Sequence, residues 1–72
     1  NQIIFDLSGL DAKIQYQILL TDLYGRILTT QQTQGGRLFS WDATYLPDGQ
    51  YTYQILSEKE IVFNGKLLKI NK

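Results

Sequence analysis

Residues 14–26 read IQYQILLTDLYGR and contain the two signals that decide the fold of this 72-residue chain. Apolar and polar side chains alternate from Ile14 to Leu20, interrupted only by Leu19, and this is the pattern of a strand with one buried face. Asp22 and Gly25 then supply turn chemistry, because an aspartate can bond its own backbone and a glycine accepts a positive φ. The stretch therefore predicts a half-buried β-strand that ends in a tight turn.

The same two-residue periodicity predicts further strands on both sides of this stretch. The expected segments are residues 2–7, 26–32, 37–41, 50–57, 61–63 and 66–70. Gly35-Gly36 is expected to form one hairpin turn, and Asn64-Gly65 carries a strong two-residue hairpin signal. No segment shows helical periodicity. About seven strands with regular turn signals predict an all-β fold, namely a small Ig-like antiparallel β-sandwich with Greek-key connections.

The composition of the chain limits the classes of function that we expect for it. Seven acidic and seven basic residues balance, and histidine, cysteine and methionine are absent. The chain therefore lacks a disulfide, a thiolate nucleophile, an imidazole base and the usual zinc ligands, so we expect neither enzymatic activity nor a cofactor in this domain. A formal net charge of zero gives no basic surface for phosphates, so we expect no nucleic-acid partner.

The length and the ends of the sequence lead to two further expectations. Residues 1–72 are expected to form a single domain, and no apolar run approaches the roughly 18 residues of a transmembrane segment. A natural reading frame begins with methionine, whereas this chain begins with Asn1 and opens on an apolar run. We therefore expect it to be a fragment of a larger protein.

The carboxylates and aromatic rings have simple structural explanations. Asp22, Asp42 and Asp48 lie beside turn residues, without the spacing of a calcium loop or of a catalytic acid pair, so we expect them to cap turns. Exposed aromatic rings can stack on sugars, and a single tryptophan in a small sandwich usually packs at the margin of the core. The candidates for sugar stacking are Tyr24, Trp41 and Tyr45.

The segment Leu46-Pro47-Asp48-Gly49-Gln50-Tyr51 predicts a structural corner. A leucine, a glycine-bearing turn and a tyrosine that opens a strand resemble the tyrosine corner of Greek-key sandwiches. In such a corner the phenol hydroxyl bonds the backbone a few residues upstream. We therefore expect Leu46 to fill the core and Tyr51 to fix the crossover.

Taken in chain order, these motifs resemble a known family. Their order and spacing resemble those of the C-terminal sorting domain of type IX secretion cargo proteins from the Bacteroidota. The matching motifs are the strand 14–20, the turn 22–26, the segment 46–51 and the stretch Gly65-Lys66-Leu67-Leu68-Lys69. That family consists of small Ig-like sandwiches. The resemblance extends from about Ile3 to Lys72. A proline-asparagine-proline segment often precedes the family's first strand, and it would lie before Asn1.

The resemblance implies sorting without chemistry inside the domain. Family cargo enters the periplasm through an ordinary signal peptide, and the outer-membrane translocon then recognises the domain. In many cargoes a sortase cleaves upstream of it, and the protein is attached to anionic lipopolysaccharide at the cell surface or released outside the cell. The positions that match the family's motifs are Asp22, Gly25, Arg26, Gly49, Tyr51, Lys66, Lys69 and Lys72.

Each of these positions also has a structural interpretation. The glycines can serve turn geometry alone, Arg26 can pair with Asp22, and lysines on an edge strand can oppose unwanted sheet pairing. Trp41-Asp42 and Tyr51-Thr52-Tyr53 also resemble the Ig-like domain of flagellar hook-capping proteins, which implies an assembly or spacer role. The alternative function is a non-cleaved Ig-like accessory module of a cell-surface protein, which packs on an upstream domain or binds a surface glycan.

Overall fold

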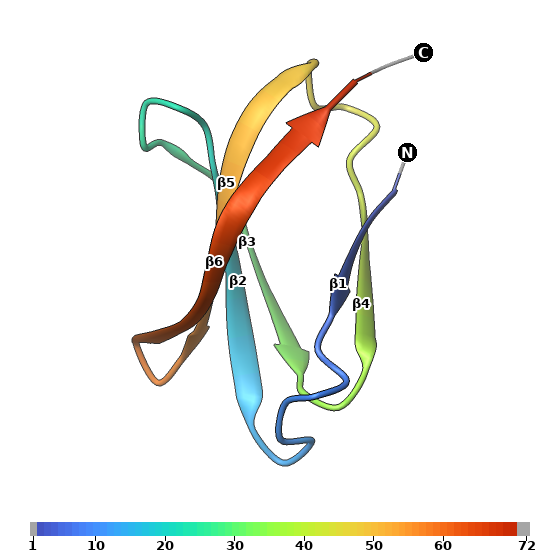
Figure 1. Cartoon of the computed structure of the whole chain (residues 1–72), viewed down its shortest axis with the longest axis vertical. Helices are drawn as coiled ribbons and strands as arrows, with labels where there is room; N and C mark the ends of the chain where they lie inside the picture. Colours follow the sequence, from blue (N-terminus) through green and yellow to red (C-terminus); the bar gives the residue numbers. More distant parts are fainter. Residues whose placement is uncertain (1, 71–72) are drawn as a thin grey trace.

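A computed structural model describes residues 2–70 and shows two antiparallel β-sheets. The described residues contain six strands: β1 (Gln2–Asp6), β2 (Gln15–Thr21), β3 (Ile27–Gln34), β4 (Leu38–Asp42), β5 (Gly49–Ser57) and β6 (Glu60–Lys69). β1 pairs with β4, and the other four strands form a sheet in the order β3-β2-β5-β6. Figure 1 shows the two sheets as two layers. The predicted all-β sandwich is therefore confirmed.

Three of the five connections cross from one sheet to the other. They are the connections β1–β2, β3–β4 and β4–β5, and such crossings are typical of Greek-key sandwiches. The prediction of a hairpin turn at Gly35-Gly36 is wrong, because β3 and β4 belong to different sheets. The amides of Gly35 and Gly36 instead donate hydrogen bonds to the carbonyls of Ile14 (3.0 Å) and Leu7 (2.8 Å). These two bonds tie the crossing to the connection between β1 and β2.

The prediction of a seventh strand is also wrong. Asn64-Gly65 lies in the middle of β6, and the turn before this strand is formed by Glu58 and Lys59, whose φ angles are 49° and 73°. Positive φ at both central residues is what a type I′ hairpin requires. Gly65 serves a different purpose, since a Cβ there would lie 2.7 Å from Tyr53 Oη and 2.8 Å from two carbons of the same ring. The glycine therefore makes room for a cross-strand aromatic ring.

The core lies between the two sheets in two adjoining clusters. Tyr16 and Ile18 of β2 are buried in the first cluster and Leu20 in the second, as the alternation predicts. Ile3 and Tyr53 are partly buried and pack against both clusters. The remaining buried members are Phe5, Leu7 and Ile55 in the first cluster and Ala43, Leu46 and Tyr51 in the second. Over residues 2–70, no helix is long and apolar enough to cross a membrane.

Candidate functional site

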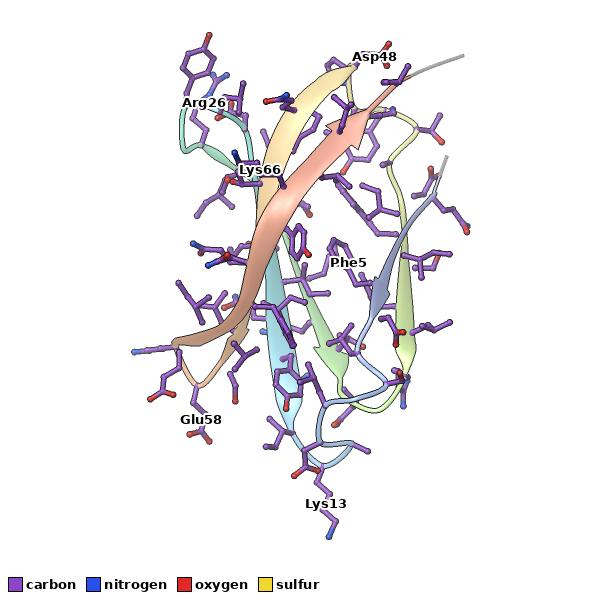
Figure 2. All side chains as sticks on the ribbon, in the orientation of Figure 1. Phe5, Lys13, Arg26, Asp48, Glu58 and Lys66 are labelled. Atoms are coloured by element: carbon purple, nitrogen blue, oxygen red, sulfur yellow. The ribbon has the colours of Figure 1, made fainter. Side chains whose placement is uncertain are left out.

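The structure brings two of the sequence motifs together at one end of the sandwich. The β2–β3 turn and the loop before β5 line an open groove of about 320 Å³, which we call the turn–loop groove. Figure 2 shows Arg26 of the turn and Asp48 of the loop at this end of the molecule. Four of the eight residues that the resemblance points to line this groove: Asp22, Arg26, Gly49 and Tyr51.

Asp22 organises the turn. Its Oδ1 accepts hydrogen bonds from the backbone amides of Tyr24 (2.9 Å) and Arg26 (3.0 Å). Its Oδ2 accepts a hydrogen bond from Arg26 Nε at 2.7 Å, so the expected ion pair is present. Gly25 has a φ of 82° and donates its amide hydrogen to the Asp22 carbonyl at 3.1 Å. Asp22 and Gly25 therefore set the shape of the turn.

Hydrogen bonds lower the pKa values of two turn carboxylates, Asp22 and Asp42. Partial desolvation raises the pKa of Asp22, but hydrogen bonds from Arg26 and Tyr24 and the charge of Arg26 outweigh it, so the pKa lies below its ordinary value. The side-chain and backbone hydrogen bonds of Thr44 likewise lower the pKa of Asp42. Asp22 and Asp42 are therefore ionised at neutral pH and cap their turns as predicted.

The loop before β5 has the hydrogen bond expected of a tyrosine corner. Tyr51 is buried, and its hydroxyl donates to the Pro47 carbonyl oxygen at 2.5 Å, four residues upstream. Leu46 is buried in the second core cluster, next to Leu20 and Tyr51. Both residues thus anchor the loop that forms one wall of the turn–loop groove.

Replacing Tyr51 by phenylalanine removes this hydrogen bond without opening a cavity. We expect the free energy of unfolding to fall by about 1 to 2 kcal/mol, because the Pro47 carbonyl loses its donor. Urea denaturation measures the change. Tyr24→Phe is the matched control, since the Tyr24 side chain is 86% exposed, and its stability should stay at the wild-type value. If both variants were as stable as wild type, the bond would not anchor the corner.

Lys69 lies inside the fold rather than on its surface. It is 8% exposed, and its ammonium donates hydrogen bonds to the carbonyl oxygens of Ala43 (2.6 Å), Thr44 (3.2 Å) and Leu46 (2.5 Å). All three carbonyls belong to the loop between β4 and β5, part of which lines the turn–loop groove. The direct recognition role implied by the resemblance does not fit this burial. Lys69 positions the loop instead.

The other two lysines of the final segment differ from Lys69. Lys66 lies opposite Thr52 in the β5–β6 ladder and is exposed. It occupies the opposite face of β6 from Lys69, as strand alternation predicts. Lys72 lies outside the described residues, so the expectation that it shares a face with Lys66 stays a prediction.

The rim of the turn–loop groove exposes apolar, aromatic and cationic groups. Leu23, Tyr24 and Leu28 all line the groove with exposed side chains. The Arg26 guanidinium lies 5.7 Å from the centroid of the Tyr24 ring, which is within cation–π range. Tyrosine and arginine are enriched among the residues that dominate protein–protein contacts. The rim therefore has the composition of a small protein-binding surface.

The three aromatic candidates for sugar stacking do not form one platform. Trp41 is partly buried and packs against the second core cluster, so the predicted position at the core margin is confirmed. Its ring meets that of Tyr45 edge-on, with centroids 5.9 Å apart. Of the three residues, only Tyr24 lines the turn–loop groove.

Local sequence patterns did not predict two features of the groove. The role of Lys69 was missed, although strand alternation places it on the same face as Leu67, whose side chain packs against the core. The alternation of side chains along this strand is therefore the sequence signal that predicts an inward-facing Lys69. The meeting of the turn with the loop has no local signal, because residues 22–26 and 46–51 are separated by two strands along the chain.

Comparisons of the chain with models of known protein families, with curated proteins and with solved structures found no significant match. Among residues 2–70, no group of three or more carboxylates is placed to hold a metal ion. The turn–loop groove and its own side chains are therefore the features that bear on function.

Proposed function

We propose that this domain is a C-terminal sorting signal that directs a cargo protein across the outer membrane through the type IX secretion system. Its partners would be the translocon and sortase components of that system, with anionic lipopolysaccharide as the final attachment. The cargo would pass through the periplasm to the cell surface or the medium. The observation that supports this most is the meeting of the turn at 22–26 and the segment at 46–51 in one groove.

The construction of this groove supports a role in recognition rather than in catalysis. The polar groups of three residues already form hydrogen bonds within the turn and the loop that they hold in place, namely those of Asp22, Tyr51 and Lys69. The rim side chains Leu23 and Tyr24 remain exposed and available for contact. A partner would therefore recognise the domain by the shape and the exposed apolar surface at this end of the sandwich.

Export of a reporter tests the proposal. Residues 1–72 are fused to the C-terminus of a periplasm-directed reporter in a host with the type IX machinery, and surface and medium fractions are assayed. We expect the wild-type fusion to be exported. The double variant Leu23→Ser, Tyr24→Ser should lower export about tenfold or more, because exposed aromatic and apolar contacts dominate such interfaces.

A matched variant controls for the general effect of removing exposed apolar groups. Leu38→Ser, Tyr45→Ser removes the same two residue types from exposed positions outside the groove, and it should leave export unchanged. The melting temperatures of both variants should stay within the wild-type range, since all four positions are exposed. Retention of a folded wild-type fusion in the periplasm would refute the sorting function and favour an accessory module.

The contribution of the final strand needs a point substitution. Deleting the chain from Lys66 onward would also remove Lys69, and loss of export would then report only unfolding. Lys66→Gln removes the exposed charge and keeps the strand intact. A fall in export with an unchanged melting temperature would assign recognition to Lys66, and unchanged export would clear it of that role.

A further inference from the structure

A second groove runs between the two layers along β1 and β6. β1 is an edge of the two-stranded sheet and β6 is an edge of the four-stranded sheet, so the two lie in different layers (Figure 1). Two open cavities of about 450 and 370 Å³ share Ile3, Ile4 and Leu67, and they are therefore sections of one groove. We call it the β1–β6 groove.

The floor of this groove is inner sheet surface that the second layer leaves uncovered. Directly paired residues of neighbouring strands share a sheet face. Phe63 pairs with Ile55 and Leu67 pairs with Tyr51, and both β5 residues are buried in the core. Phe63 nevertheless remains 54% exposed. The cause is the narrow two-stranded sheet, in which β1 is the last strand and none of the described residues continues the layer over Phe63.

The wall of the groove is the unpaired edge of β1. β1 pairs with β4 on one side, and the described residues provide no strand on its other side. Backbone groups of the free edge can pair with an added strand, whose alternate side chains would point toward Phe63 and Leu67. β1 has five residues, so its edge is about 17 Å long at 3.3 Å per residue. An extended peptide matches both the edge and the apolar floor, whereas a compact ligand would leave the edge unpaired.

The charged residues that line the larger section are Asp6 and Lys66, and neither selects a charged occupant. The Asp6 carboxylate already accepts hydrogen bonds from the amide (2.9 Å) and hydroxyl (2.6 Å) of Ser8. Lys66 pairs with Thr52, so its side chain lies on the face of β6 opposite to that of Phe63 and Leu67. The free edge of β1 and the apolar floor therefore select the occupant.

We propose that the β1–β6 groove captures an extended segment of a partner protein as an added strand on β1. The segment places apolar side chains at alternate positions over Phe63 and Leu67. This capture does not depend on the sorting function, because the β1–β6 groove and the turn–loop groove share no lining residue.

A titration followed by nuclear magnetic resonance tests the capture. The probe is the capped synthetic peptide Thr-Ile-Thr-Ile-Glu-Ile-Thr, added to the isotopically labelled 72-residue chain. We expect amide shifts to change in residues 2–6 and 63–69. Phe63→Ser should weaken binding about tenfold, because the peptide loses most of the apolar surface on the floor. Ile27→Ser is the matched control at an exposed position of β3, the opposite edge of the sheet, and it should bind like wild type.

Three outcomes would overturn the capture itself. They are the absence of binding at millimolar peptide, shift changes outside β1 and β6, and an unchanged affinity in a folded Phe63→Ser variant. Concentration-dependent doubling of the mass, with the same shifts in the absence of peptide, would assign the groove to a second copy of the chain instead. None of these results depends on export, so the capture and the sorting function fail separately.

Discussion

Lys69→Met is expected to destabilise the domain by about 3 kcal/mol, since each hydrogen bond to a charged group is worth about 1.5 to 3 kcal/mol and unpaired buried carbonyls are costly. The substitution keeps the length of the side chain and removes the ammonium that bonds Ala43, Thr44 and Leu46. A core of this size supplies only about 3 to 5 kcal/mol of net stability, so a large fraction of the variant should be unfolded at 37 °C.

Lys66→Met is the matched control for this prediction. It makes the same change three residues earlier on the same strand, at an exposed position, and its effect should stay within about 0.5 kcal/mol. Urea denaturation of the three proteins measures the difference. An unfolding free energy for Lys69→Met within about 1 kcal/mol of the control, which is less than the worth of a single bond to a charged group, would show that the three carbonyls find other partners.

The loss should also have a local signature. If Lys69 holds the loop between β4 and β5, amide exchange in residues 43–48 should accelerate in the folded fraction of Lys69→Met, while exchange in β2 changes only with global stability. Export of the reporter fusion should fall as well, because Leu46 and its neighbours would no longer be held against the turn–loop groove. Fast exchange confined to this loop would distinguish a positioning residue from a general core defect.

Gly35→Ala is expected to cost about 3 kcal/mol, at the upper end of the range for overpacking a core. A Cβ at this buried position would lie 2.3 Å from the carbonyl oxygen of Asp11 and 2.8 Å from Tyr16 Cε2. The nearest atom belongs to the backbone and cannot move aside alone. The crossing between β3 and β4 would have to shift away from the β1–β2 connection, and the bond from the Gly35 amide to Ile14 would weaken.

Gly9→Ala is the control for the glycine substitution. No atom lies within 4 Å of a Cβ built at Gly9, and its φ is not positive. Its stability should match or slightly exceed that of wild type, because alanine lowers the entropy of the unfolded chain. Thermal denaturation of both variants separates the two effects. Equal melting temperatures would mean that the crossing has room for a methyl group.

The glycines illustrate how far local sequence patterns reach. Gly25 was predicted to accept a positive φ and does so at 82°. Gly35 and Gly65 were also predicted to form turns, but each is a glycine because another side chain or backbone group lies against it. A dipeptide signal cannot separate these causes, since backbone freedom is a local property and close approach depends on which segment packs there.

The lysines illustrate the same limit for the functional residues. Lys66 and Lys69 were assigned together from the resemblance, yet one is exposed and the other is buried under the loop between β4 and β5. Alternation along β6 separates their faces, but only the packed loop decides that the inner lysine bonds three carbonyls. A charged residue on an inner face should therefore be tested first as a loop anchor.

The sequence by itself determined the all-β fold, the approximate positions of five of the six strands, the turn at 22–26 and the bond from Tyr51 to the upstream backbone. These features depend on side-chain alternation and on contacts within a few residues, and the order of the amino acids specifies both directly. Only the tertiary structure decided that β3 and β4 lie in different sheets, that β6 is one continuous strand, that Lys69 is buried, and that two grooves form. Those outcomes depend on which distant segments share a layer, and apolar burial selects that arrangement for the whole chain at once.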